Sequence, residues 1–218
     1  MRWTGWALAA LMVTGCRAPL RPAEPHPIPM TGTVQELAAA IDADAKRSDH
    51  EPDSKIRGEL AAQASRDAAA CLDRAPQSAA CLYGRAIALG LEARAHPTRA
   101  GELLNTMLDS LGNAEAADPG YDEAGPARVR ALVLIRAPGW PLGPGDTEAG
   151  LAAARRAATL RPQYPPNLLA LAEALSKTGN SSGARENYER ARALAQALPA
   201  SEDRDGWIHE AGEALRRQ

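Results

Sequence analysis

One pentapeptide in the sequence has the spacing of a catalytic motif. Residues 179–183 read Gly-Asn-Ser-Ser-Gly and satisfy the G-x-S-x-G pattern of the hydrolase nucleophile elbow, with Ser181 at the nucleophile position. That elbow needs a β-strand directly before it. Here the preceding residues have helical periodicity, so we interpret the pentapeptide as a turn between two helices. Its polar side chains suit the N-cap of the second helix.

The remaining polar residues show no spacing that is typical of a metal, phosphate or acid–base site. The four histidines, His26, His50, His96 and His209, are scattered, without a second ligand at a spacing such as H-x-x-x-H. The carboxylates fall at polar positions of predicted helices, where pairs with arginine explain them. No G-x-x-x-x-G-K loop occurs. We therefore predict no metal, no cofactor and no enzymatic activity.

The composition favours helices that approach one another closely. Hydrophobic residues make up 45% of the chain, aromatic residues only 4%, and phenylalanine is absent. Much of the hydrophobic share is alanine, which is small and is the best helix former. A formal net charge of -2 leaves no surplus of basic residues for binding phosphates. The composition predicts an all-α fold and excludes nucleic acid as a partner.

Residues 1–15 are predicted to be a signal peptide of the lipoprotein type. Arg2 precedes an apolar run from Trp6 to Val13, which is too short to span a bilayer. The run ends in Val-Thr-Gly-Cys, which resembles a lipobox, the motif whose cysteine is acylated and becomes the new N-terminus. Each acyl methylene contributes about 0.8 kcal/mol of membrane binding, so we expect Cys16 to anchor the protein in a membrane. The alternative is a plain secretory signal with an incidental cysteine.

Residues 16–33 are predicted to be a tether between the lipid and the folded domain. They carry prolines at positions 19, 22, 25, 27 and 29, which remove backbone donors and keep a chain extended. Arg17 follows the cysteine, at the position where an aspartate would favour retention in the inner membrane of many Gram-negative bacteria. The expected location is the bacterial cell envelope, facing the periplasm, with the outer membrane favoured.

Residues 34–217 are predicted to form a domain of repeated helices. A first helix is expected over residues 34–46, followed by a polar break over 47–54. Beyond it, three prolines recur at intervals of 43 residues, and small or apolar residues recur at fixed offsets before each proline. The prolines are Pro76, Pro119 and Pro162; five residues earlier stand Cys71, Ala114 and Ala157, and eight residues earlier stand Ala68, Leu111 and Ala154.

The last copy identifies the type of repeat. Residues 168–194 fit the 34-residue tetratricopeptide pattern, with Gly179 in the turn between two helices. A 43-residue period is also compatible with HEAT repeats, but the last copy fits the tetratricopeptide pattern without an insertion. The extra residues of the other copies fall within each helix pair, at 96–99 and 137–146. We therefore predict a right-handed stack of tetratricopeptide-like helical hairpins, an α-solenoid.

The second insertion, Ala137–Asp146, is too rich in glycine and proline to be helical. Together with a helix over 122–136 and residues 147–164, it resembles the T component of TRAP-associated transporters (TatT). The resemblance covers residues 59–194. Members of that family are periplasmic tetratricopeptide lipoproteins, usually longer than this chain, and some are trimers around an apolar cavity. The resemblance implies a periplasmic TRAP substrate-binding protein as partner, or an apolar ligand, and it admits a homo-oligomer.

Two functions remain open from the sequence. The first is a lipid-anchored scaffold that binds a protein or apolar ligand as an accessory of TRAP-type solute uptake, since stacked helix pairs form a continuous concave surface. The second is a pilotin-like lipoprotein that assists the assembly of an outer-membrane complex. Genomic neighbours would separate them, because TRAP permease genes favour the first function and pilus genes the second.

The predicted contact surface combines the glycine- and proline-rich loop with the concave face. Its candidate residues are Trp140 as the anchor, Leu142 beside it, and Tyr121 and Tyr164 after the repeat prolines. Exposed loops often carry function, and tryptophan is enriched among residues that dominate binding energy. The alternative is structural, in which Trp140 folds back and covers the gap between its own two helices.

The cysteines that remain after Cys16 are predicted to form a disulfide. Cys71 and Cys81 lie five residues on either side of Pro76, so a turn there would place them at the same height on facing helices. Helix axes about 8 to 10 Å apart leave facing Cα atoms near the roughly 4.4 to 6.8 Å that a bridge tolerates. The bridge would stabilise the fold by about 2 to 3 kcal/mol. The alternative is two small buried thiols at positions where the repeat usually has alanine.

Overall fold

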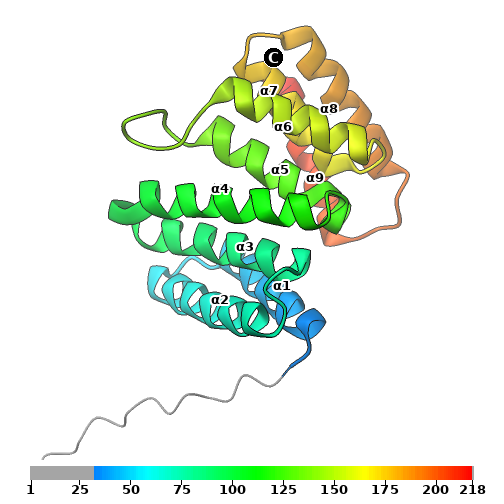
Figure 1. Ribbon diagram of the computed structural model, residues 1–218. Helices are drawn as coiled ribbons and strands as arrows, with labels where there is room; N and C mark the ends of the chain where they lie inside the picture. Colours follow the sequence, from blue (N-terminus) through cyan, green and yellow to red (C-terminus); the bar gives the residue numbers. More distant parts are fainter. Residues whose placement is uncertain (1–31, 218) are drawn as a thin grey trace, which may run out of the picture.

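The computed structural model describes residues 32–217, and this part of the chain is a stack of helices in which each packs against its neighbours (Figure 1). The all-α, solenoid-like fold class is therefore confirmed. Cys16, the predicted signal peptide and nearly all of the predicted tether lie outside the described residues. No helix in the described range is long and apolar enough to cross a membrane. The helices are α1 (Val34–His50), α2 (Ser54–Arg74), α3 (Ala79–Ala95), the short 3-10 helix η1 (Pro97–Arg99), α4 (Ala100–Ala117), α5 (Tyr121–Arg136), α6 (Thr147–Leu160), α7 (Pro165–Lys177), α8 (Ser181–Gln196) and α9 (Glu202–Arg216).

The 43-residue repeat sets the ends of three helices. Helices α2, α4 and α6 each end two residues before a repeat proline. The first residue after each helix donates its backbone N–H to the carbonyl of the small repeat residue, and these small residues are fully buried. Small side chains at these positions let the next helix approach closely. The three bonds run from Ala75 to Cys71 (2.9 Å), from Asp118 to Ala114 (2.9 Å) and from Arg161 to Ala157 (3.0 Å).

The first helix is longer than the sequence predicted. It begins with a capping box, in which Glu36 N–H donates to the Thr33 hydroxyl while the Glu36 carboxylate accepts from Thr33 N–H. It continues to His50 because the polar side chains after Lys46 have partners: Ser48 is buried and accepts from Arg94 of α3 at 3.0 Å. The break therefore covers only residues 51–53, at Pro52.

The core is built from small residues, as the composition predicted. Its largest fully buried side chains include Ile41, Leu111 and Leu168, and most other buried apolar residues are alanines. At Gly84, a Cβ atom would lie 2.8 Å from Ile41 Cδ1, so glycine permits α3 to approach α1. Helix α3 also contacts α5, so α1, α3 and α5, the first helices of three successive pairs, follow one another along one side of the stack.

The predicted disulfide is confirmed. Cys71 near the end of α2 is bonded to Cys81 at the start of α3, with Cα atoms 5.2 Å apart. Both residues are completely buried, and they form a small apolar cluster with Leu37 of α1. The bridge therefore links the first two helix pairs beside the turn at Pro76.

The predicted helix over residues 122–136 is wrong at its start. Asp122, Glu123 and Ala124 have φ angles of 47°, 53° and 65°, so they form a left-handed turn, and right-handed geometry begins only after them. Non-glycine residues adopt this region at a cost of about 1 to 3 kcal/mol each. Pro126 explains where the helix can begin, because proline fits a first helical turn and disfavours helical geometry at the residue before it.

The G-x-S-x-G pentapeptide is an interhelical turn, as predicted. It follows helix α7 rather than a strand, and Gly179 has a φ of 84°, which only glycine adopts without strain. The side chain of Asn180 caps α8 by accepting the N–H of Gly183 at 2.9 Å. Ser181 is an exposed residue at the start of α8. The pentapeptide therefore connects two helices of the last repeat.

Candidate functional site

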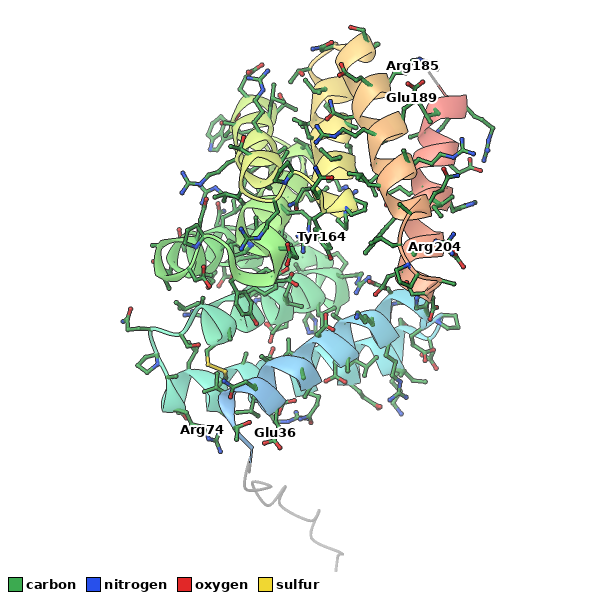
Figure 2. All side chains as sticks on the ribbon, turned by 90° about the vertical axis from the view of Figure 1, so that its right-hand side faces the viewer. Glu36, Arg74, Tyr164, Arg185, Glu189 and Arg204 are labelled. Atoms are coloured by element: carbon green, nitrogen blue, oxygen red, sulfur yellow. A yellow bond between two sulfur atoms is a disulfide. The ribbon has the colours of Figure 1, made fainter. Side chains whose placement is uncertain are left out.

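A groove of about 680 Å³ lies on the side of the stack formed by α1, α3 and the start of α5, and it is bounded by α7 and α9. Figure 2 faces this side and shows Tyr164 between the blue α1 and the red α9. The α1 side combines alanines with the charged residues Asp42 and Lys46, whereas the aromatic rings lie on the other elements. The groove is lined by Gln35, Ala38, Ala39, Ile41, Asp42, Ala45, Lys46, Ala80, Tyr83, Gly84, Ile87, Tyr121, Asp122, Arg128, Tyr164, Pro166, Asp203 and Trp207.

The aromatic residues of the described chain concentrate in this groove. Four of the six that lie between residues 32 and 217 line it, although the whole chain is only 4% aromatic. They form two edge-to-face pairs, Tyr83 with Tyr121 at 5.5 Å between ring centroids and Tyr164 with Trp207 at 5.6 Å. Burial raises the pKa of all three tyrosines, so their phenols stay neutral at physiological pH. Such rings offer both apolar faces and hydroxyl groups to a ligand.

A buried arginine connects the two aromatic pairs. The Arg128 guanidinium donates to the Asp122 carboxylate at 2.8 Å and lies over the Tyr164 ring, 5.2 Å from its centroid. The same carboxylate oxygen accepts the Tyr83 hydroxyl at 2.9 Å. The groove floor is therefore one continuous chain of contacts from Tyr83 through Asp122 and Arg128 to Tyr164 and Trp207.

The left-handed turn of α5 is held from behind by the same arginine and by Asn167 of α7. Arg128 Nη1 donates to the backbone carbonyls of Asp122 and Glu123 and to Asn167 Oδ1, each at 3.1 to 3.2 Å. Asn167 is fully buried, and its amide nitrogen donates to the carbonyl of Glu123 at 2.9 Å. It also donates to the carbonyls of Ala157 and Arg161 at the end of α6, both at 3.2 Å. The carbonyls of Ala157 and Arg161 also accept the backbone N–H groups of Arg161 and Tyr164, so the side chain of Asn167 joins the left-handed turn to an already bonded helix end.

The rim of the groove is charged where α1 approaches α9. The Lys46 ammonium lies 3.2 Å from the Asp42 carboxylate and 3.9 Å from that of Asp203. One helical turn further along α1, His50 Nε2 lies 3.9 Å from the Glu202 carboxylate. The hydrogen bond to Asp42 raises the pKa of Lys46, and the charge of Asp203 adds to that effect. The first and last helices of the described chain therefore meet through side-chain charges.

The glycine- and proline-rich loop projects between α5 and α6 (Figure 1). Trp140 is 91% exposed and Leu142 is 78% exposed, so the indole ring does not cover the gap between its two helices, and the structural alternative for Trp140 is wrong. The loop is closed by backbone bonds from Gly145 to Pro138 and from Asp146 to Leu134, both 2.9 Å. The loop thus exposes the apolar side chains of Trp140 and Leu142 on a backbone that hydrogen bonds hold in place.

The structure divides the four predicted contact residues between two places. Tyr121 and Tyr164 line the groove, whereas Trp140 and Leu142 stand at the opposite end of α5 beside the start of α4. The 12 right-handed residues of α5, 125–136, separate these places by roughly 18 Å at 1.5 Å per residue. One compact ligand cannot contact both. A partner protein could, if it extended along the stack.

Sequence reasoning missed Tyr83, Trp207 and Arg128. Tyr121 and Tyr164 were found because they occupy equivalent positions after two repeat prolines. Trp207 continues the same 43-residue spacing after Tyr164, but no proline stands two residues before it, and Tyr83 has no aromatic counterpart one repeat away. Arg128 follows Gly125-Pro126, a pair that signals an irregular helix start and could have drawn attention to the segment.

The sequence matches no protein-family model, and a search of curated proteins finds no match to it.

Proposed function

We propose that this protein is a binding scaffold that holds a partner protein in the aromatic groove. The observation that carries the proposal is the gathering of Tyr83, Tyr121, Tyr164 and Trp207 in one concave site of a chain with few aromatic residues. Aromatic residues are enriched where binding energy is concentrated, and stacked helix pairs provide extended concave surfaces for partners. The described residues bring no group of three histidine, cysteine or acidic side chains into an arrangement for metal binding.

The cellular setting of the proposal rests on the sequence. The lipobox-like segment ending in Cys16 supports a lipid anchor in the bacterial envelope, with the domain facing the periplasm. The resemblance to the T component of TRAP-associated transporters supports a role as an accessory of solute uptake. On this proposal the partner in the groove is a periplasmic substrate-binding protein of a TRAP transporter.

The test compares two variants that carry the same substitution. Ala39 is exposed and lines the groove from α1, so Ala39→Trp should obstruct the groove without disturbing the core. Ala62 is equally exposed on α2 and does not line the groove, so Ala62→Trp is the matched control. The measurement is binding of a purified TRAP substrate-binding protein from the same organism to the intact protein in mild detergent.

We expect Ala39→Trp to weaken this binding at least tenfold and Ala62→Trp to change it less than twofold. Equal binding by the wild type and Ala39→Trp would contradict the groove as the contact surface. Failure of the wild type to bind the TRAP protein, together with binding of a secretin subunit, would instead support the pilotin-like function.

A further inference from the structure

We propose that the groove recognises a lysine or arginine side chain carried by an extended segment of the partner protein. The inference rests on the proposed function, because it assumes that the groove is the contact surface. It adds the chemistry of the occupant, which follows from the charges, the rings and the dimensions of the groove.

The charges that line the groove favour a cation over an anion. Three carboxylates, those of Asp42, Asp122 and Asp203, face two cations, Lys46 and Arg128. Arg128 is fully engaged, since it donates to a carboxylate, two backbone carbonyls and the amide of Asn167 while it covers the Tyr164 ring. A ligand carboxylate would have to break these buried bonds to reach it. Of the two lining cations, only Lys46 could then bind an anionic ligand without breaking these bonds.

Lys46 occupies the position that a ligand cation would take. Its ammonium lies between the carboxylates of Asp42 on α1 and Asp203 on α9, at 3.2 and 3.9 Å. All three side chains are more than half exposed, so the lysine can withdraw into solvent without leaving a buried gap. Displacement of Lys46 would leave two carboxylates at the rim, directly beside Trp207 of the groove. An incoming ammonium or guanidinium group would then replace one cation by another.

The aromatic rings suit the same occupant. Cations bind over ring faces, and Arg128 already does so above Tyr164 within this groove. The apolar stem of a lysine or arginine can lie along aromatic and alanine surfaces while its charged end reaches the rim.

The dimensions suit an extended segment. The lining residues of α1 run from Gln35 to Lys46, a rise of roughly 16 Å along the helix. About five residues of an extended chain cover that distance at roughly 3.3 Å each. Three of the seven lining residues of α1, Ala38, Ala39 and Ala45, have small side chains and leave room for a peptide backbone beside them.

The first experiment uses three acetylated and amidated pentapeptides, Ala-Ala-X-Ala-Ala, in which X is arginine, norleucine or glutamate. Each competes with a fluorescein-labelled arginine peptide for the intact protein in mild detergent, followed by fluorescence anisotropy. We expect the arginine peptide to compete at least fivefold better than the norleucine peptide and the glutamate peptide to compete least. Equal or better competition by norleucine or glutamate would overturn the inference, and so would absence of binding by the labelled peptide.

The second experiment uses two charge variants that should act in opposite directions and a third as their control. Asp203→Asn should weaken binding of the arginine peptide about threefold, because it removes the attraction of one charge pair at roughly 6 Å in water. Lys46→Gln should strengthen binding of the same peptide by a similar factor, because the substitution removes the ammonium group that competes for the two carboxylates. Asp205→Asn is the control, since Asp205 is an exposed carboxylate of the same helical turn that does not line the groove. An anion site would reverse both signs and overturn the inference.

These results separate the inference from the proposed function. If the peptides fail while Ala39→Trp still blocks the TRAP substrate-binding protein, the groove remains the contact surface and its preference for cations is refuted. If Ala39→Trp has no effect on the partner protein, the proposed function fails first.

Discussion

Replacement of Cys71 and Cys81 together by alanine should lower the free energy of unfolding by about 2.7 kcal/mol. The two residues are 10 apart in sequence, and the disulfide closes that loop in the unfolded chain as well as in the folded one. The loss of chain entropy on closing a loop of this length corresponds to roughly 2.7 kcal/mol at 25 °C. For a domain of this size, such a change lowers the Tm by roughly 5 to 10 °C.

The structure makes this substitution a clean measurement of the cross-link. Both cysteines are completely buried, so their replacement exposes no new surface. The next repeat has alanine at each equivalent position, Ala114 for Cys71 and Ala124 for Cys81, and both alanines are also completely buried. Alanine is therefore a side chain that this fold already packs at these positions. The packing loss should be small beside the entropic effect.

The assay is urea and thermal unfolding of the oxidised wild type, the reduced wild type and the double alanine variant in one buffer. The reduced wild type is the control, because it lacks the cross-link but keeps both sulfur atoms. We expect it to match the double variant within about 1 kcal/mol. A loss below about 1 kcal/mol would refute the reasoning from chain entropy, and a double variant much less stable than the reduced wild type would show that packing dominates.

Four further expectations follow from the structure and the sequence. Asn167→Ala should lower the free energy of unfolding by about 1 to 3 kcal/mol in urea unfolding, because three backbone carbonyls each lose one of their donors and Arg128 loses its amide acceptor. Trp140→Ala should change it by less than about 0.5 kcal/mol in the same assay, since the indole is almost fully exposed; a drop of several degrees in Tm would contradict this. Burial, with the charge of Asp67 as a second cause, raises the pKa of Asp44, so ionisation of Asp44 opposes folding above that pKa. Asp44→Asn should therefore stabilise the protein at neutral pH, and the gain should vanish as the pH falls through the raised pKa in a pH series of unfolding curves. Cys16→Ser should move the protein from the membrane fraction to the soluble fraction on cell fractionation, and unchanged membrane association would place the anchor elsewhere.

The repeat was predictable because its signals are local and recur. A proline after a helix and a small residue one turn before the helix end act on the same helix, so their spacing can be read from the sequence. The turn at Gly179 and the bridge between Cys71 and Cys81 follow from the same frame. The end of α1 was placed too early because Ser48 is buried by a bond to Arg94, a residue 46 positions away. The pattern of polar residues after Lys46 does not reveal that Ser48 will bond to Arg94.

The groove was only partly predictable for a similar reason. Three of its rings, Tyr121, Tyr164 and Trp207, follow the 43-residue spacing. Tyr83 joins them through a bond to Asp122, 39 residues further along the chain. That bond requires the left-handed turn of α5, which local propensity disfavours. The left-handed turn is itself stabilised by Asn167, which donates to the carbonyl of Glu123 from 44 residues further along the chain. Side chains distant in sequence therefore decide the backbone of the site.

One repeat position shows how a regular stack acquires an irregular site. Cys81, Ala124 and Asn167 are equivalent residues 43 apart, and all three are completely buried. The first forms the disulfide, the second completes the left-handed turn, and the third donates to carbonyls of that turn and of α6. Because Asp122 reaches both Tyr83 and Arg128 from the left-handed turn at the start of α5, the groove floor lies where the backbone departs from the regular repeat.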